Sequence, residues 1–232
     1  MQDLKQSDIE LIVNKFSKYS ENCHHRYRSF DFCYSHFYLS KHNNQIDIER
    51  SCYVLWSYLA SWGMLRGSSF LLQKNPSYLK DLVEFIYSQE ESIWKIDVND
   101  YKDNIEKIIE LYKCTAQRIV PNGNRQLVLV TKVLLGTLGI VPAYDTYFCQ
   151  TFRTLSKQMN KSYCSFGSVN KASLSFIADF YLANQTVIDN LQKSHYIYGF
   201  TGNKTDLLYT KVKIIDMYGF QKGLDLYQAS KK

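Results

Sequence analysis

The 232-residue sequence lacks any apolar run of the length that crosses a membrane. Its first residues, MQDLKQSDIE, are polar and acidic where a secretory signal has a basic start followed by an apolar stretch. The two most apolar stretches, residues 52–65 and 127–141, are both shorter than the roughly 20 residues of a membrane span. The sequence therefore predicts a cytoplasmic protein that has no membrane partner.

Motifs for several common chemistries are also missing. The chain has no P-loop, no dinucleotide-binding fingerprint and no serine or cysteine nucleophile pattern. Its six cysteines include no C-x-x-C pair, which favours reduced, structural thiols. Cys23, His24 or His25, Cys33 and His36 offer nitrogen and sulfur ligands, but their spacing fits no standard zinc module. We therefore expect neither a metal nor a cofactor.

Helical periodicity is what the sequence does contain, from end to end. With 45% apolar residues and 15% aromatics, the chain can build a large core. Ser7 and Glu10 have the spacing of a capping box, and an i, i+3, i+4, i+7 apolar stripe follows them. The pattern predicts an all-α fold, with residues 1–232 in a single globular multi-helix domain or a bilobed one.

Capping residues and apolar stripes set the expected helices. Helices are predicted from Ser7, from about Phe30, after Asn44 or Asp47, after Asn75-Pro76, up to Pro121, from Asn124 to Gly136 or Gly139, and over 144–159, 171–191 and 206–218. Residues 89–100 are expected to be a polar connector, and YIYGFTGN, residues 196–203, a glycine-rich loop.

Carboxylates are almost absent from residues 111–178. This segment has one, Asp145, against eight basic residues, whereas the rest of the chain has 20 basic and 21 acidic side chains. The net charge of +6 therefore comes from this segment alone. Its basic residues are Lys113, Arg118, Arg125, Lys132, Arg153, Lys157, Lys161 and Lys171. Such an asymmetry favours a polyanionic partner, and its alternative is an ordinary solvated helix surface in a lysine-rich chain.

Three of these residues recur with helical spacing. Arg153, Lys157 and Lys161 stand at i, i+4 and i+8, which places them on one helix face that can meet the phosphates of DNA. Together with Arg125 they are the candidate nucleic-acid-binding residues. Asp145 begins the same predicted helix, where a carboxylate can cap the free N–H groups or can stabilise a cationic transition state.

The stretch TKVLLGTLGIVPAYDTYFCQTF, residues 131–152, resembles the helix-hairpin-helix DNA glycosylase superfamily. In that family a lysine-containing helix leads through a short loop and a proline to an aspartate at the start of the next helix. The resemblance implies a glycosylase-like fold, a role for Asp145 in stabilising the sugar cation, Lys132 as the candidate amine, and bases extruded from DNA as substrates.

This sequence departs from the family pattern at two points. The glycine-rich hairpin before the lysine is absent, and Lys132 stands closer to Asp145 than the family's lysine does to its aspartate. Lys132 shares a helix face with Val128 and Leu135, so the alternative is a structural lysine that extends its amine to solvent. The whole chain also resembles a bacterial protein family carrying the segments WGMLRGSS and KIIDMYGF, a resemblance that implies no activity.

Arg66, Ser68 and Ser69 are a second candidate site. They lie between two predicted helices, where a guanidinium, two hydroxyls and backbone N–H groups can bind an anion, and the alternative is a plain interhelical turn. Tyr196, Tyr198 and Phe200 can stack on bases or simply pack.

Three functions follow from the sequence. The first is a DNA-binding base-excision protein, a hydrolase of the DNA glycosylase type. The second is a nucleic-acid-binding helical module without chemistry. The third is a protein-interaction or small-ligand-binding protein.

Overall fold

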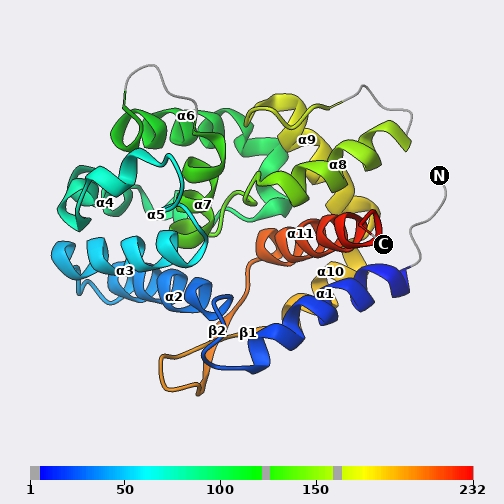
Figure 1. Cartoon of the computed structure of the whole chain (residues 1–232), viewed down its shortest axis with the longest axis horizontal. Helices are drawn as coiled ribbons and strands as arrows, with labels where there is room; N and C mark the ends of the chain where they lie inside the picture. Colours follow the sequence, from blue (N-terminus) through cyan, green and yellow to red (C-terminus); the bar gives the residue numbers. More distant parts are fainter. Residues whose placement is uncertain (1–5, 122–125, 159–163, 232) are drawn as a thin grey trace.

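Helices occupy most of the chain in the computed structural model, which describes residues 6–121, 126–158 and 164–231 (Figure 1). Eleven α-helices and three short 3-10 helices, η1 to η3, are joined by short connections in this part of the chain. The bounds are α1 Gln6–Glu21, α2 Arg28–His42, α3 Ile48–Ser61, η1 Phe70–Gln73, η2 Pro76–Leu79, α4 Lys80–Tyr87, α5 Glu91–Trp94, η3 Val98–Asp100, α6 Tyr101–Ile119, α7 Leu127–Leu138, α8 Thr146–Gln158, α9 Lys171–Ala183, α10 Gln185–Ser194 and α11 Lys211–Ala229. The predicted all-α, single-domain class is confirmed.

Several predicted helix ends match the structure. Asp47 caps α3 by accepting the backbone N–H of Arg50, and Asn75 with Pro76 opens η2, which leads directly into α4. Gly139 ends α7 in the left-handed conformation at φ 66°, which glycine adopts without steric cost. The predicted Asn124 cap lies outside the described residues.

Three expectations about local structure were wrong. Residues 89–100 form α5 and η3 and place Trp94 and Val98 in the core, because their sparse apolar residues all face inward. The helix predicted over 171–191 is two helices, α9 and α10, that meet at Asn184. Residues 204–208 are a strand, and the last helix begins only at Lys211.

A short hairpin replaces the expected loop at residues 196–203. Strand β1, Tyr196–Tyr198, pairs antiparallel with β2, Lys204–Leu208, and is fixed to α2 by buried Asp31. The Asp31 carboxylate accepts the Tyr209 hydroxyl at 2.6 Å, the Tyr198 N–H at 3.1 Å and the Arg28 guanidinium at 3.0 Å. This buried ion pair, satisfied on several sides, holds the hairpin against the helices.

Helix α7 lies at the centre of the molecule. It packs against α2, α3 and α6, and every residue from Leu129 to Leu138 is buried. An all-round apolar helix needs such a position, because each of its faces requires a partner. Lys132 is the one charged residue within this helix.

Helices α8 and α11 pack side by side in the most extensive helix–helix contact among the described residues, and α1 packs against α11 (Figure 1). Gly223 permits this approach, because a Cβ at that position would overlap the Tyr147 backbone. The loop from residue 139 to 145 joins α7 to α8. It therefore connects the helices that pack around α7 with the pair formed by α8 and α11.

Candidate functional site

Lys132 and Asp145 line the same small cavity. Its walls come from the end of α3, the middle of α7, the residues before α8 and the first turns of α11. The lining residues are Tyr58, Trp62, Lys132, Leu135, Ala143, Asp145, Lys213, Asp216 and Phe220. The cavity volume is about 10 Å³, which is close to the space that one water molecule needs.

The loop that leads to Asp145 is held by side chains from three helices. The Tyr101 hydroxyl of α6 donates to the Ile140 carbonyl at 2.6 Å, and Thr131 of α7 accepts the Tyr144 N–H at 3.0 Å. Asp216 of α11 accepts the N–H of Ala143 at 2.9 Å. The backbone immediately before Asp145 is therefore fixed from outside the loop.

Asp145 is an N-cap, as one of the two sequence interpretations predicted. Its Oδ1 accepts the N–H of Phe148 at 3.0 Å, and the N–H of Tyr147 also donates to the carboxylate. Burial nevertheless raises the pKa of Asp145 to about 6, against the opposing effects of Lys132 and the two N–H groups. The carboxyl thus titrates unusually close to neutral pH.

Lys132 is buried, and the prediction that its amine extends to solvent was wrong. The residue is 4% exposed, its Nζ donates to the Trp62 carbonyl at 3.1 Å, and it lies 4.9 Å from the centre of the Trp62 ring. Burial lowers the pKa of Lys132 to about 8, although Asp145 and Asp216 act in the opposite direction. Sequence periodicity missed this position, because it cannot show that helices cover all sides of α7.

Two further charged residues complete the cavity and were not predicted. Lys213 and Asp216 of α11 are 1% and 5% exposed and form a salt bridge of 2.8 Å. The cavity therefore holds two lysines and two aspartates, and Asp145 is not the only carboxylate in its surroundings. The signal was present in VKIIDMYGF, because a lysine and an aspartate three residues apart within an apolar helix require each other when both are buried.

Stacked aromatic rings cover Lys132. The Trp62 ring stacks on Tyr27 at 5.2 Å, and Tyr27 stacks on Phe16 at 4.3 Å. The Arg26 guanidinium lies 5.5 Å from the ring centres of both Tyr27 and Trp62. The indole N–H of Trp62 is buried and has no hydrogen-bond partner within the described residues.

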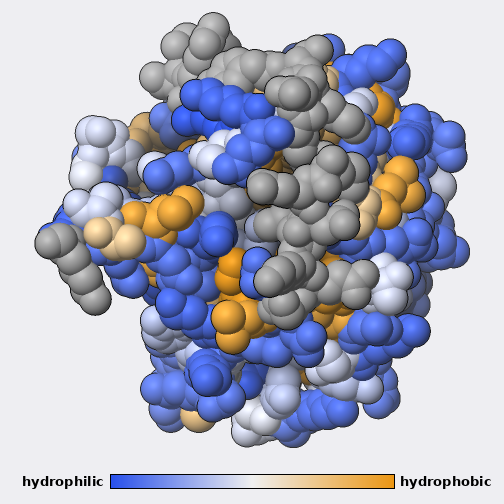
Figure 2. Space-filling view, turned by 90° about the vertical axis from the view of Figure 1, so that its right-hand side faces the viewer, coloured by the Kyte–Doolittle hydropathy of each residue, from blue (hydrophilic) through white to orange (hydrophobic). Residues whose placement is uncertain are grey.

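The basic residues of the 111–178 segment do not share one surface. Lys132 is inside, and Arg118 lies over the Phe85 ring and pairs with Asp81 at 3.7 Å. Arg153 and Lys157 are exposed on α8, and the Arg153 side chain donates to the Ser165 carbonyl. Figure 2 shows that the side of the molecule near the end of α8 is mainly hydrophilic. Arg125 and Lys161 lie outside the described residues.

The predicted anion site at Arg66, Ser68 and Ser69 forms a turn before η1. The Ser69 hydroxyl donates to the Met64 carbonyl at 2.6 Å and accepts the Leu71 N–H, so it is already used locally. Arg66 and Ser68 are exposed. An anion there remains a prediction, although the turn leads into a four-residue 3-10 helix and not into an α-helix.

The Cys/His-rich segment is divided between core and surface. Cys33 is buried, His36 bonds to the Ser51 hydroxyl at 2.8 Å, and Cys23 and His24 are exposed. Over the described residues, no group of three or more His, Cys, Asp and Glu side chains is placed to hold a metal ion. In the same part of the chain, no helix combines the length and the apolarity that crossing a bilayer requires.

Comparison with known proteins gives no indication of function. The chain matches no protein-family model, no curated protein and no solved structure. The function of this chain must therefore be inferred from its residues and their geometry.

Proposed function

We propose that this chain is a DNA-binding base-excision protein of the N-glycosylase class. The observation that carries the proposal is that Lys132 and Asp145 line one cavity, with the pKa of the amine lowered and that of the carboxyl raised. Perturbed titratable groups that converge on one cavity are typical of catalytic sites. The resemblance of residues 131–152 to the glycosylase superfamily names the chemistry.

In the proposed reaction the neutral amine of Lys132 attacks C1′ of a deoxyribose. The bond from C1′ to the base breaks with its electron pair going to the base, which takes up the proton that the Lys132 nitrogen loses. The sugar ring then opens to leave an imine between C1′ and Lys132, and water hydrolyses this imine to free the amine and the abasic site. The ionised Asp145 stabilises the positive charge that develops on the sugar. A pKa of about 8 leaves a useful fraction of Lys132 unprotonated just above neutral pH, and a pKa of about 6 keeps Asp145 ionised there.

Substrate entry requires movement of the aromatic cover. A cavity of about 10 Å³ does not admit a nucleobase, and Trp62 and Tyr27 stand over Lys132. Trp62 ends α3 and contributes no side-chain hydrogen bond within the described residues, so its displacement breaks ring–ring and cation–ring contacts but no side-chain hydrogen bond. Binding of an extruded nucleotide should therefore change the tryptophan fluorescence.

The test is abasic-site formation on duplexes that each carry one damaged or modified base. Asp145→Asn is the matched variant, because asparagine caps a helix as well as aspartate does and only the charge is lost. We expect it to lower the rate about 100-fold or more, the usual effect of losing one transition-state contact. Lys132→Gln should abolish covalent trapping by borohydride, while the exposed Lys107→Gln should leave both readouts unchanged. A wild-type protein that is inert on a broad panel, or an active Asp145→Asn, refutes the proposal.

A DNA-binding module without chemistry is the second candidate, and two observations favour it. Asp145 is used as a cap, and Arg153 and Lys157 are exposed on the helix that it caps. In that case Arg153→Glu combined with Lys157→Glu should abolish DNA binding, while Asp145→Asn leaves binding intact. Binding measured at two salt concentrations separates this candidate from a protein that does not contact phosphates, because phosphate contacts weaken steeply with salt.

A further inference from the structure

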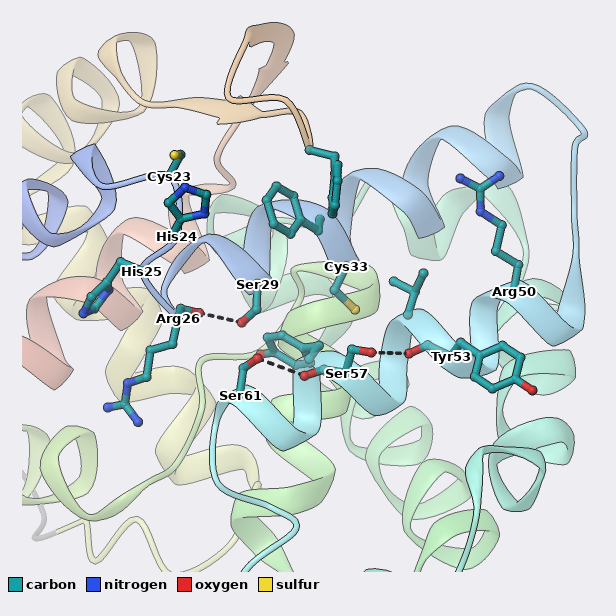
Figure 3. A pocket seen from close by; sticks show the side chains of 14 residues that line it. Cys23, His24, His25, Arg26, Ser29, Cys33, Arg50, Tyr53, Ser57 and Ser61 are labelled. Carbon is teal, nitrogen blue, oxygen red and sulfur yellow. Dashed lines mark hydrogen bonds between the residues drawn. The ribbon is translucent and has the colours of Figure 1, made fainter.

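A broad groove lies between α2 and α3 on the side of the molecule that carries the hairpin tip (Figure 3). Its volume is about 540 Å³, within the range of sites that bind small molecules. Its lining residues are Cys23, His24, His25, Arg26, Ser29, Phe32, Cys33, Arg50, Tyr53, Val54, Ser57, Tyr58, Ser61 and Phe200. The groove and the Lys132 cavity have one lining residue in common, Tyr58, and they share no charged residue.

The charge of the groove is of one sign. None of the lining residues is acidic, and Arg50 and Arg26 lie at opposite ends of the groove (Figure 3). Neither guanidinium forms an ion pair in the part of the chain that the structure describes. The groove therefore favours an anion and has no carboxylate to repel one.

Aromatic rings provide the remaining surface. Phe200, at the hairpin tip, is 88% exposed and lies 5.6 Å from the Phe32 ring, and Tyr53 of α3 is 54% exposed. Exposed rings gathered on one groove indicate a binding surface, and each ring offers a face for a planar group.

Three serine hydroxyls define the polarity of the ligand. Ser29, Ser57 and Ser61 each donate to a backbone carbonyl of their own segment (Figure 3). Their lone pairs stay available, so these hydroxyls can accept hydrogen bonds but have already used their own donor. A ligand that carries N–H or O–H donors matches them.

We infer that this groove binds a planar aromatic anion of the nucleoside-monophosphate class. The ring lies against Phe32 and Phe200, the sugar hydroxyls or base amino groups donate to the serines, and Arg50 binds the phosphate. The inference does not rest on the proposed function, because Lys132 and Asp145 do not line the groove. The nucleotide is either free or one unit of a single strand.

The experiment is an NMR titration of the isotope-labelled 232-residue chain. The probes are the four common nucleoside monophosphates, adenosine, inorganic phosphate and a short single-stranded oligonucleotide. We expect at least one monophosphate to shift groove resonances with a Kd of about 1 mM or tighter, and adenosine and phosphate to bind at least about fivefold more weakly. Stronger binding of the oligonucleotide to the same residues assigns the nucleotide to a strand, and binding of monophosphates alone assigns it to a free ligand.

Two variants separate shape from charge. Ser57→Trp fills the groove from an exposed position and should weaken binding about tenfold or more, whereas Thr154→Trp, an exposed hydroxyl on α8 with the same local hydrogen bond, should not. Arg50→Gln should weaken the monophosphate at least about threefold and leave adenosine unchanged, with Lys107→Gln as the charge control. Absence of shifts at about 10 mM of every monophosphate, or undiminished binding by Ser57→Trp, overturns the inference. Asp145→Asn should bind nucleoside monophosphates as the wild type does. Nucleotide binding in the groove can therefore be judged even if the protein shows no base-excision activity.

Discussion

The buried pair Lys213–Asp216 gives the sharpest test of the energetics of the cavity. In Asp216→Asn the amide oxygen can still accept the Ala143 N–H, but the Lys213 ammonium, which is 1% exposed in the wild type, loses the one ion pair that it forms with another described residue. Removal of one partner from a buried pair typically costs about 3–5 kcal/mol, because a charge stays buried without compensation. We therefore expect Asp216→Asn to lower the free energy of unfolding by about 3 kcal/mol or more.

The double variant decides whether this cost comes from the unpaired charge. Lys213 is surrounded by the Phe16, Phe30 and Trp62 rings at 4.6–5.5 Å, so a methionine in its place meets apolar partners. Lys213→Met combined with Asp216→Asn removes both charges and should lie within about 1–2 kcal/mol of the wild type. The two substitutions should thus be strongly non-additive, with a coupling of about 2 kcal/mol or more.

Urea unfolding followed by circular dichroism measures these differences, provided that the denaturant slopes agree. The exposed pair Lys15–Asp225, with a comparable distance of 2.7 Å, is the matched control. Asp225→Asn should cost less than about 1 kcal/mol, because solvent screens that pair. An Asp216→Asn variant that costs no more than Asp225→Asn would contradict a cost from an unpaired buried charge. A double variant destabilised by the sum of its single substitutions would contradict it too.

Three further perturbations address the loop and the helices around the cavity. Because the pKa of Asp145 is raised from 3.8 to about 6, the wild type should lose stability relative to Asp145→Asn as the pH rises from about 4 to 6. Above pH 6 the difference in stability should stay constant. Urea midpoints at several pH values measure this difference, and a wild type that gains stability over the same pH range contradicts the prediction. Tyr101→Phe leaves the buried Ile140 carbonyl without its 2.6 Å hydrogen bond and should cost about 1–3 kcal/mol in the same assay. Gly223→Val places side-chain atoms against the Tyr147 backbone and should lower the Tm by about 5 °C or more, and an unchanged Tm would show that α8 and α11 can separate freely.

The fold class and many helix ends were accessible to sequence reasoning because they depend on local chemistry. The α3 cap at Asp47 and the α7 end at Gly139 need only a side chain or a φ angle that the local sequence provides. The hairpin was missed because its strands are short and because Asp31, which fixes it, stands 167 residues before Tyr198. The sequence signals that remained were the alternation in Tyr196–Tyr198 and the glycines of the turn.

The candidate site was only partly predictable. The relation of Lys132 to Asp145 is local, since both belong to one helix–loop–helix stretch, and the sequence pointed to both residues. Lys213 and Asp216 reach the cavity from α11, about 70–80 positions further along the chain, and only tertiary packing brings them there. Charge counting along residues 111–178 therefore could not show that a second carboxylate faces the cavity.

Lys132 is the residue of the cavity whose presence most needs an explanation. Asp216 holds the Ala143 N–H, Lys213 pairs with Asp216, and Asp145 caps α8. Within the described residues, Lys132 contacts the Trp62 ring and donates a hydrogen bond to the Trp62 carbonyl at the end of α3, where a cation also meets the negative end of the helix dipole. A lysine pKa lowered to about 8 means that burial of the ammonium outweighs that contact at neutral pH.

Lys132→Met should therefore raise the free energy of unfolding at pH 7. This gain should shrink as the pH rises above about 8, because the folded wild type then carries a neutral amine while Lys132 of the unfolded chain is still protonated. If the same variant also loses covalent trapping, the lysine is retained for chemistry at the expense of stability. If Lys132→Met is instead destabilised at pH 7, the contact with Trp62 outweighs burial, and Lys132 belongs to the structure of the α3 end.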